Sequence, residues 1–190
     1  TADLYQVIGL SLYRNSEFTK SLVYCGEALK LYDRYGTGNS GSKQLVINTM
    51  SQLYRRLDQP KEAEEYFKKG LSLSGDADNR EKYLVYINYA FFLAEKGRVD
   101  EGVVVLEDGL RNVRRVFGPN SREYYLMLAS RADFAHNSSK EGQKALEMYE
   151  ICLPYIESHP WDISMKKYLL TDYARTLFDV GLYGKALEMA

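Results

Sequence analysis

Small and large apolar residues recur along the chain at helical spacing. In each recurrence a small residue is followed four positions later by a large one, and three positions after that by another small one. The complete sets are Ser21, Cys25 and Ala28; Ala63, Phe67 and Gly70; Gly102, Leu106 and Gly109; and Ala145, Tyr149 and Cys152, and a fifth set begins at Ala186. Spacings of four and three place such residues on one face of an α-helix, where small side chains let a neighbouring helix approach closely.

A second apolar stripe precedes each of these sets. Twelve or thirteen residues upstream stands another small residue, with a large apolar residue four positions before it. These small residues are Gly9, Ser51, Ala90, Ala132 and Ala174. Because only short polar or breaker segments separate the two stripes, each repeat is predicted to be a pair of antiparallel helices. The predicted pairs are 3–14 and 17–35, 43–57 and 60–74, 79–96 and 99–116, 121–137 and 140–157, and 163–180 with a helix from 183 onward.

Local signals refine some of these boundaries. Asp78 with Glu81, and Asn120 with Glu123, have the spacing of a capping box at two helix starts. Pro154 lies inside an otherwise helical pattern, so a kink or a helix end is expected near it.

The combined pattern resembles the tetratricopeptide repeat. The stretches YRRLDQPKEAEEYFKKGL and LAEKGRVDEGVVVLEDGL match that family's turn and second helix closely, and the resemblance covers the whole chain. Successive sets lie 42, 39, 43 and 41 residues apart, whereas the family's usual period is about 34 residues. The longer period, and the segment RRVFGPNSREYYLMLASRADF, resemble the kinesin-light-chain type of array. Arg131 departs from the family at a position that is usually apolar.

The resemblance implies an all-α fold, a right-handed superhelical solenoid of antiparallel helix pairs. It implies one array over residues 1–190, with units at 1–38, 39–77, 78–118 and 119–160 and a truncated fifth unit at 161–190. Because the sequence stops shortly after its last predicted helix begins, we expect the chain to be a fragment of a longer array.

The resemblance also implies where a ligand binds, because the first helix of each unit lines a concave face in this family. Candidate binding residues are first-helix positions outside the packing positions. They are Gln6, Leu10, Tyr13, Asn48, Gln52, Arg55, Asn88, Phe91, Asp133, Thr171 and Arg175. Amide side chains can bond an extended peptide backbone, arginine can pair with carboxylates, and the apolar residues can serve as anchors. The leading interpretation is therefore a non-catalytic module that binds a peptide or partner domain in the groove.

Some members of the family hold a C-terminal tail with a clamp of lysine and asparagine. No lysine stands at the matching positions, so no clamp of that kind is expected. Those positions are Gln6, Leu10, Thr49, Leu84 and Asn88.

Two other classes of function stay open. The chain fits a regulatory or sensor segment of a larger multidomain protein, such as a caspase-like protease or a signalling kinase, since long-period arrays often sit beside such domains. It also fits a structural array that associates with itself, and the sequence does not set the oligomeric state.

Charge and hydropathy argue against a nucleic-acid partner and a membrane partner. The formal net charge is −1 and the pI is near 6.2, so no concentrated basic surface indicates a nucleic-acid partner. No apolar run approaches the ~20 residues of a membrane span, so no membrane partner is predicted. The segment TADLYQVIGL has no signal-peptide pattern, and the few cysteines fit a cytoplasmic protein.

No catalytic residue, cofactor site or metal site is predicted, and the chain is not expected to be an enzyme. A dyad of Cys152 and His159 would need an exposed, activated thiol, but the repeat position of Cys152 predicts burial. No metal-ligand cluster with a known spacing occurs. The run Gly36-Thr37-Gly38 has no strand before it and no Gly-Lys-Ser/Thr after it, so it is interpreted as a linker.

Overall fold

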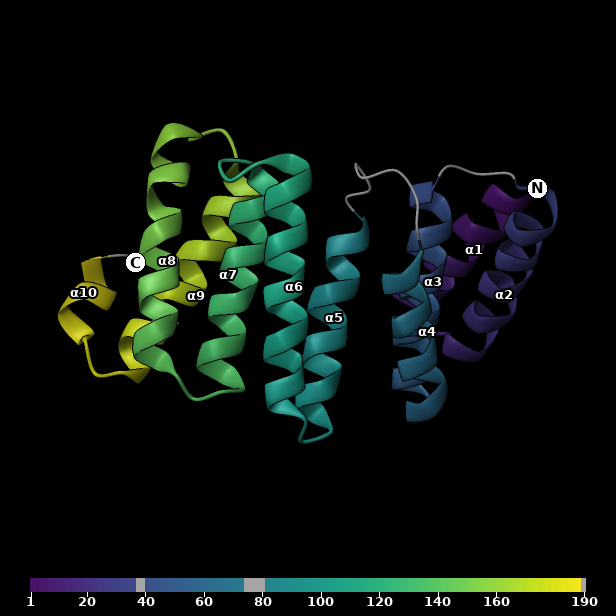
Figure 1. Cartoon of the computed structure of the whole chain (residues 1–190), viewed down its shortest axis with the longest axis horizontal. Helices are drawn as coiled ribbons and strands as arrows, with labels where there is room; N and C mark the ends of the chain where they lie inside the picture. The colour runs from purple at the N-terminus through teal and green to yellow at the C-terminus, as the bar shows by residue number, and fades with distance from the viewer. Residues whose placement is uncertain (37–39, 74–80, 189–190) are drawn as a thin grey trace. The chain divides into compact units, whose positions relative to one another are not determined.

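The chain is described by a computed structural model that covers residues 1–36, 40–73 and 81–188 (Figure 1). Within these ranges every regular element is helical and none is a strand. The helices are α1 (Ala2–Arg14), α2 (Phe18–Tyr35), α3 (Ser40–Arg56), α4 (Pro60–Ser72), α5 (Glu81–Glu95), α6 (Val99–Phe117), α7 (Arg122–Asn137), α8 (Gly142–Ser158), α9 (Ile163–Asp179) and α10 (Tyr183–Glu188). Each predicted helix has an observed counterpart with bounds within a few residues.

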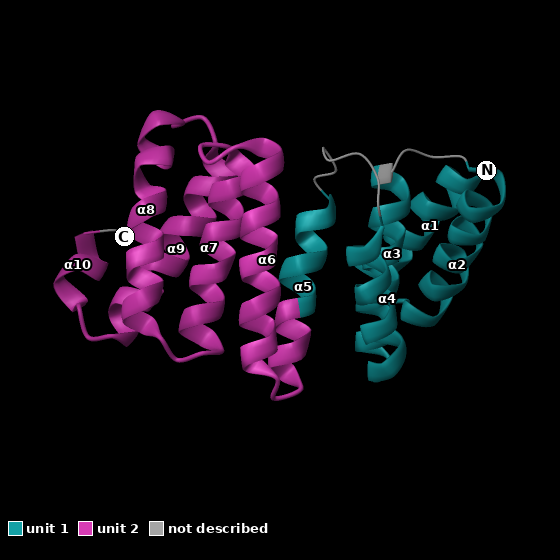
Figure 2. Cartoon of the chain, viewed as in Figure 1, with its two compact units in different colours: residues 1–89 teal, residues 90–190 magenta. Residues whose placement is uncertain are grey.

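The helices form two compact units, Thr1–Tyr89 and Ala90–Ala190, and the division falls inside α5 (Figure 2). In the first unit α1 packs on α2, α3 packs on α4, and α3 also contacts α1 and α2. In the second unit α7 contacts α6, α8 and α9, and α9 contacts α8 and α10. The predicted boundaries at 38/39 and 77/78 lie outside the described residues, so the division into five units stays a prediction.

Each hairpin turn holds one residue in the left-handed region of the backbone. The residue after it donates its N–H to a carbonyl in the last turns of the preceding helix, over 2.8–2.9 Å. This bond ends the first helix in the manner of a Schellman motif. The left-handed residues are Ser16, Asp58, Gly97, Lys140 and Gly181. Their spacings of 42, 39, 43 and 41 residues equal those of the sequence pattern, so the turn geometry repeats with the same period.

The small and large positions form the core as predicted. Every residue of the four complete sets is buried on the second helices. The approach of the neighbouring helix is close, because a Cβ built at Gly102 would lie 2.9 Å from the carbonyl oxygen of Ala90. A Cβ at Gly9 would lie 2.6 Å from Cys25 Sγ. Small residues are therefore required at these points for the helices of a pair to meet.

The predicted helix caps and the predicted effect of Pro154 were less accurate than the predicted helices. Ser121, not Asn120, caps α7, and its Oγ accepts a hydrogen bond from Tyr124 N at 3.1 Å. The Asp78 cap lies outside the described residues. Helix α8 continues through Pro154 and ends four residues later, where Ser158 Oγ donates to the Pro154 carbonyl at 2.9 Å.

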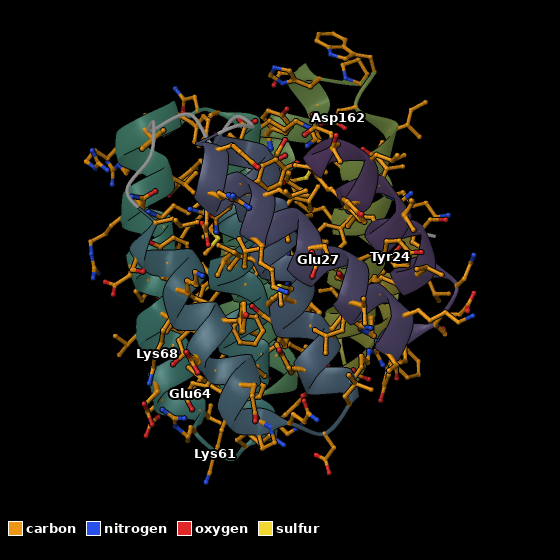
Figure 3. All side chains as sticks on the ribbon, turned by 90° about the vertical axis from the view of Figure 1, so that its right-hand side faces the viewer. Tyr24, Glu27, Lys61, Glu64, Lys68 and Asp162 are labelled. Atoms are coloured by element: carbon orange, nitrogen blue, oxygen red, sulfur yellow. The ribbon has the colours of Figure 1, made fainter. Side chains whose placement is uncertain are left out.

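The solvent-facing side of α4 is charged. Lys61, Glu64 and Lys68 project from this helix (Figure 3). Lys68 Nζ lies 2.9 Å from Glu64 Oε1, one helical turn away. Because the Lys68 side chain is 63% exposed, an i,i+4 pair of this kind contributes only about 0.3–0.5 kcal/mol, so α4 is held mainly by its apolar stripe.

Candidate functional site

The predicted binding residues lie on α1, α3, α5, α7 and α9, the first helices of the hairpins. Five of them directly follow the small packing residue of their helix, and so occupy equivalent positions. These are Leu10, Gln52, Phe91, Asp133 and Arg175. They belong to two compact units, and each unit is considered separately below.

In the first unit the structure brings four predicted residues together on α3 and α5. Asn88 Nδ2 donates to Asn48 Oδ1 over 3.0 Å and joins the two helices. One turn along α3 from Asn48, Gln52 Oε1 accepts a hydrogen bond from Arg55 Nη1 at 3.0 Å. Asn48 and Gln52 are each only 8% exposed. The Nε2 atom of Gln52 is buried and has no hydrogen-bond partner among the residues that the structure describes.

The three predicted residues on α1 have other roles. Gln6 is buried, and its Oε1 lies 2.6 Å from the hydroxyl of Tyr32 on α2. Tyr13 packs on Phe18 with ring centroids 6.0 Å apart, and Leu10 is half-buried. Gln6 and Tyr13 therefore serve first to hold α1 against α2.

In the second unit Arg175 joins α9 to α7. Its Nη2 lies 3.0 Å from Asp133 Oδ1 and 2.7 Å from Asp172 Oδ1. Burial raises the pKa of both aspartates, and the nearby charge of Arg175 opposes that rise. Phe91 meets Phe134 edge-on at 5.3 Å, so it is a packing residue, whereas Thr171 is exposed.

Replacing Arg175 with methionine is expected to destabilise the protein by about 1–2 kcal/mol at pH 7, because two partly buried carboxylates lose their counter-charge. The cost is below that of a fully buried pair because the Arg175 side chain is 49% exposed. Each aspartate has a raised folded-state pKa, so its charge costs stability as the pH rises through that value. Urea unfolding should therefore show a much smaller difference at acid pH, where both carboxyls are protonated.

Thr171→Ala on the same helix provides the control: helix propensity should raise its free energy of unfolding by at most about 0.7 kcal/mol, and equally at both pH values. A loss in Arg175→Met that is equal at both pH values would mean that the side chain acts through packing and not through its charge.

The two cysteines are structural. Cys25 and Cys152 are fully buried, and burial raises the pKa of their thiols to about 11 and about 12. Cys152 Sγ donates to the Met148 carbonyl at 3.3 Å, while His159 stacks on the ring of Tyr155. The geometry does not support a Cys152–His159 dyad. In the described part of the chain no group of three or more His, Cys, Asp or Glu side chains is placed to hold a metal ion.

Comparison with solved structures identifies the fold. The chain matches BtubC (BKLC) from P. vanneervenii with a TM-score of 0.78 at 14% identity, over 99% of this chain and 76% of that one. It matches the TPR-like repeats of a putative kinesin light chain from Podosopora anserina with a TM-score of 0.70 at 14% identity, over 98% and 90%. The fold is a tetratricopeptide-like helical solenoid. Pseudomonas aeruginosa pilF also matches, with a TM-score of 0.66 at 20% identity, over 99% of this chain and 72% of that one.

These likenesses confirm the predicted all-α, tetratricopeptide-like fold of antiparallel helix pairs. No protein-family model matches the sequence, and no curated protein matches it. No helix among the described residues is long and apolar enough to cross a membrane.

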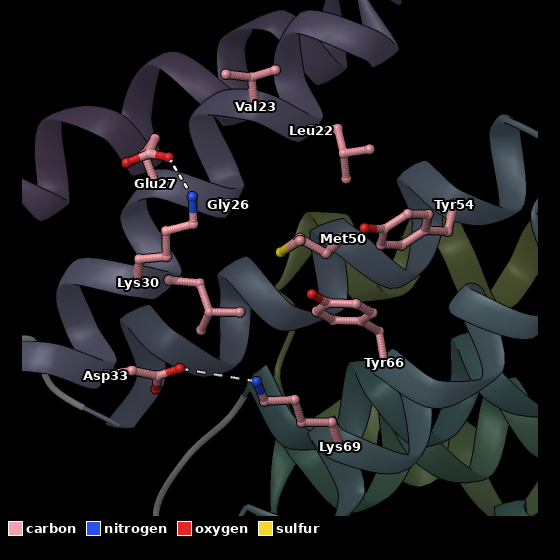
Figure 4. A pocket seen from close by; sticks show the side chains of 11 residues that line it. Leu22, Val23, Gly26, Glu27, Lys30, Asp33, Met50, Tyr54, Tyr66 and Lys69 are labelled. Atoms are coloured by element: carbon pink, nitrogen blue, oxygen red, sulfur yellow. Dashed lines mark hydrogen bonds and ion pairs between the residues drawn. The ribbon is translucent and has the colours of Figure 1, made fainter.

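Grooves that the sequence pattern did not predict lie between the second helices of neighbouring hairpins. In the first unit a groove of about 460 Å³ lies between α2 and α4 over α3 (Figure 4). Met50, Tyr54 and Tyr66 line it, with the two tyrosine rings 5.2 Å apart. The charged side chains beside it pair with one another, Glu27 with Lys30 at 2.7 Å and Asp33 with Lys69 at 4.0 Å.

The second unit has an equivalent groove of about 300 Å³ between α6 and α8. Its floor is one stripe of α7, with Tyr124, Leu128 and Arg131 at spacings of four and three. Arg131 is the residue that departs from the family pattern, and its side chain is only 2% exposed. That departure was the one signal in the sequence that pointed to this surface.

Proposed function

We propose that the chain is a non-catalytic protein-interaction module that binds a peptide or a partner domain along its first helices. Stacked helical hairpins present long surfaces of this kind, and the fold is shared with repeat proteins such as BtubC and pilF. A net charge of −1 gives no support to a nucleic-acid partner.

The observation that carries the proposal is the buried amide of Gln52. An amide donor without a partner costs about 1–3 kcal/mol when it is buried, so a ligand carbonyl that accepts from Nε2 would recover that energy. The Asn48–Asn88 bond beside it uses one donor and one acceptor of two amides. The remaining amide groups match the N–H and C=O of an extended peptide backbone. Arg55 adds a positive charge next to Gln52.

The test begins with a peptide selected from a random display library against the wild-type protein. Its affinity is then measured by calorimetry for Gln52→Ala and Asn48→Ala, each of which should weaken binding at least about tenfold, as expected of central contact residues. Phe91→Ala is a poor probe, because Phe91 packs on Phe134 and its loss would disturb the fold.

Gln143→Ala is the matched control, since Gln143 is an exposed glutamine on the second helix α8. It should bind the peptide as the wild type does. Unchanged affinity in both Gln52→Ala and Asn48→Ala, with circular dichroism showing folded protein, would overturn the first-helix assignment.

A further inference from the structure

The groove between α6 and α8 contains a buried arginine, Arg131, and not all of its hydrogen-bond donors have acceptors among the described residues. Arg131 Nε donates to Glu107 Oε1 over 2.9 Å. Its Nη1 is buried and has no hydrogen-bond partner among the described residues. The Glu107 side chain is 44% exposed and can turn toward solvent. Packing therefore does not fix its carboxylate beside the guanidinium of Arg131. A guanidinium carries five N–H donors, and a buried donor without an acceptor lowers the stability of the folded protein.

Packing does not require a charge at this position. The equivalent residue, which directly precedes the small residue of the first helix, is apolar or aromatic in every other repeat. These residues are Ile8, Met50, Tyr89 and Tyr173. Met50 lines the matching groove of the first unit, where no arginine occurs. Since a buried ion pair is often no more stable than an apolar pair of similar volume, stability alone does not account for Arg131.

The other lining residues define the chemistry that the groove can accept. Arg111 and Arg114 lie on its rim, and Arg111 pairs with Asp108. Arg114 makes no ion pair with any described residue and is exposed. With Glu107 counted, the groove has a small excess of positive charge, which suits a single carboxylate better than a doubly charged phosphate. Its apolar walls are Leu110 of α6 and Met148 of α8, beside Leu128 of the floor.

We propose that this groove binds a peptide segment in which a carboxylate side chain is followed by an apolar one. The carboxylate bonds the guanidinium of Arg131 and displaces or joins Glu107, with Arg114 as the second cation. The apolar side chain packs between Leu110 and Met148. This surface is separate from the first-helix surface that carries the proposed function.

Two fluorescein-labelled peptide pools provide the probe. Both are N-acetylated and C-amidated, and they are identical except that a central Glu-Leu in one is Gln-Leu in the other. Fluorescence polarisation should show that the Glu pool binds the full chain at least about tenfold more tightly than the Gln pool. Arg131→Met, which installs the residue of the equivalent groove, should remove that preference while keeping the thermal stability of the wild type.

Arg114→Gln should weaken binding of the Glu pool severalfold, and Arg115→Gln, the exposed neighbour that does not line the groove, should not. Gln52→Ala should leave this binding unchanged, which separates the result from the first-helix surface. Equal binding of the two pools, or full binding by a folded Arg131→Met, overturns the proposal. If Arg131→Met unfolds, an unchanged affinity in Arg114→Gln overturns it instead. Binding of a phosphoserine pool in place of the Glu pool also overturns it.

Discussion

Gly102→Ala is expected to destabilise the protein by about 2–3 kcal/mol, although alanine normally favours a helix over glycine by about 1 kcal/mol. Gly102 lies on α6 where α5 and α7 approach. A new Cβ would lie 2.6 Å from Phe134 Cζ and 2.9 Å from the Ala90 carbonyl oxygen. The aromatic ring could turn aside, but the carbonyl belongs to a helix backbone and can move only with that helix. Urea unfolding followed by far-ultraviolet circular dichroism measures the loss.

Gly26→Ala is the matched control, with the opposite sign. Gly26 also lies within a helix, α2, but among the described residues no atom outside the local backbone of α2 lies within 4 Å of the Cβ position. The same substitution should therefore stabilise the protein by up to about 1 kcal/mol through helix propensity. A neutral or stabilising effect of Gly102→Ala would contradict the close approach of the helices described at this point.

Phe67→Ala is expected to cost about 3–5 kcal/mol, the largest loss among the single substitutions considered. Phe67 is the large residue of the second set, fully buried on α4. Its ring stacks on Tyr89 of α5, with centroids 5.3 Å apart and planes at 24°. Truncation removes this contact and leaves a cavity between α4 and α5. The cavity persists because two helices cannot move together far enough to fill it. Equilibrium unfolding in urea gives the change in free energy.

Phe178→Ala makes the same chemical change at a residue that is 60% exposed. Its ring meets Tyr183 edge-on at 5.1 Å, so a loss below about 1 kcal/mol is expected. Comparable losses in the two variants would show that position 67 does not have the burial described here.

The helical hairpins were predictable because their signals are periodic and local. A small residue such as Gly102 is required wherever two helices meet closely, so the pattern and the packing coincide. The cap of α7 was misplaced by one residue, since both Asn120 and Ser121 are good capping residues. Their backbone geometry, which the sequence does not show, decides between them.

The binding surface was less predictable, because a position on a helix face does not say what its side chain touches. Asn48 and Gln52 lie one turn apart on α3, as their spacing requires, and their role in binding stays a prediction. Gln6 is instead tied to Tyr32, and Phe91 to Phe134, through partners on other helices. The second-helix grooves depend on how three helices surround a hollow, so the sequence contained only one hint of them, the unusual Arg131.

Two polar contacts between first helices have a consequence for how the array assembles. Asn48 with Asn88, and Asp133 with Arg175, join residues 40 and 42 positions apart, one repeat along the chain. The repeats share one pattern of small and large residues, so the pattern alone does not distinguish the correct neighbour of a helix from another repeat. Docking against the wrong repeat would leave an amide or a charge without its partner, at a cost of about 1–3 kcal/mol. The polar pairs thus favour contact between each first helix and its correct neighbour while the chain folds.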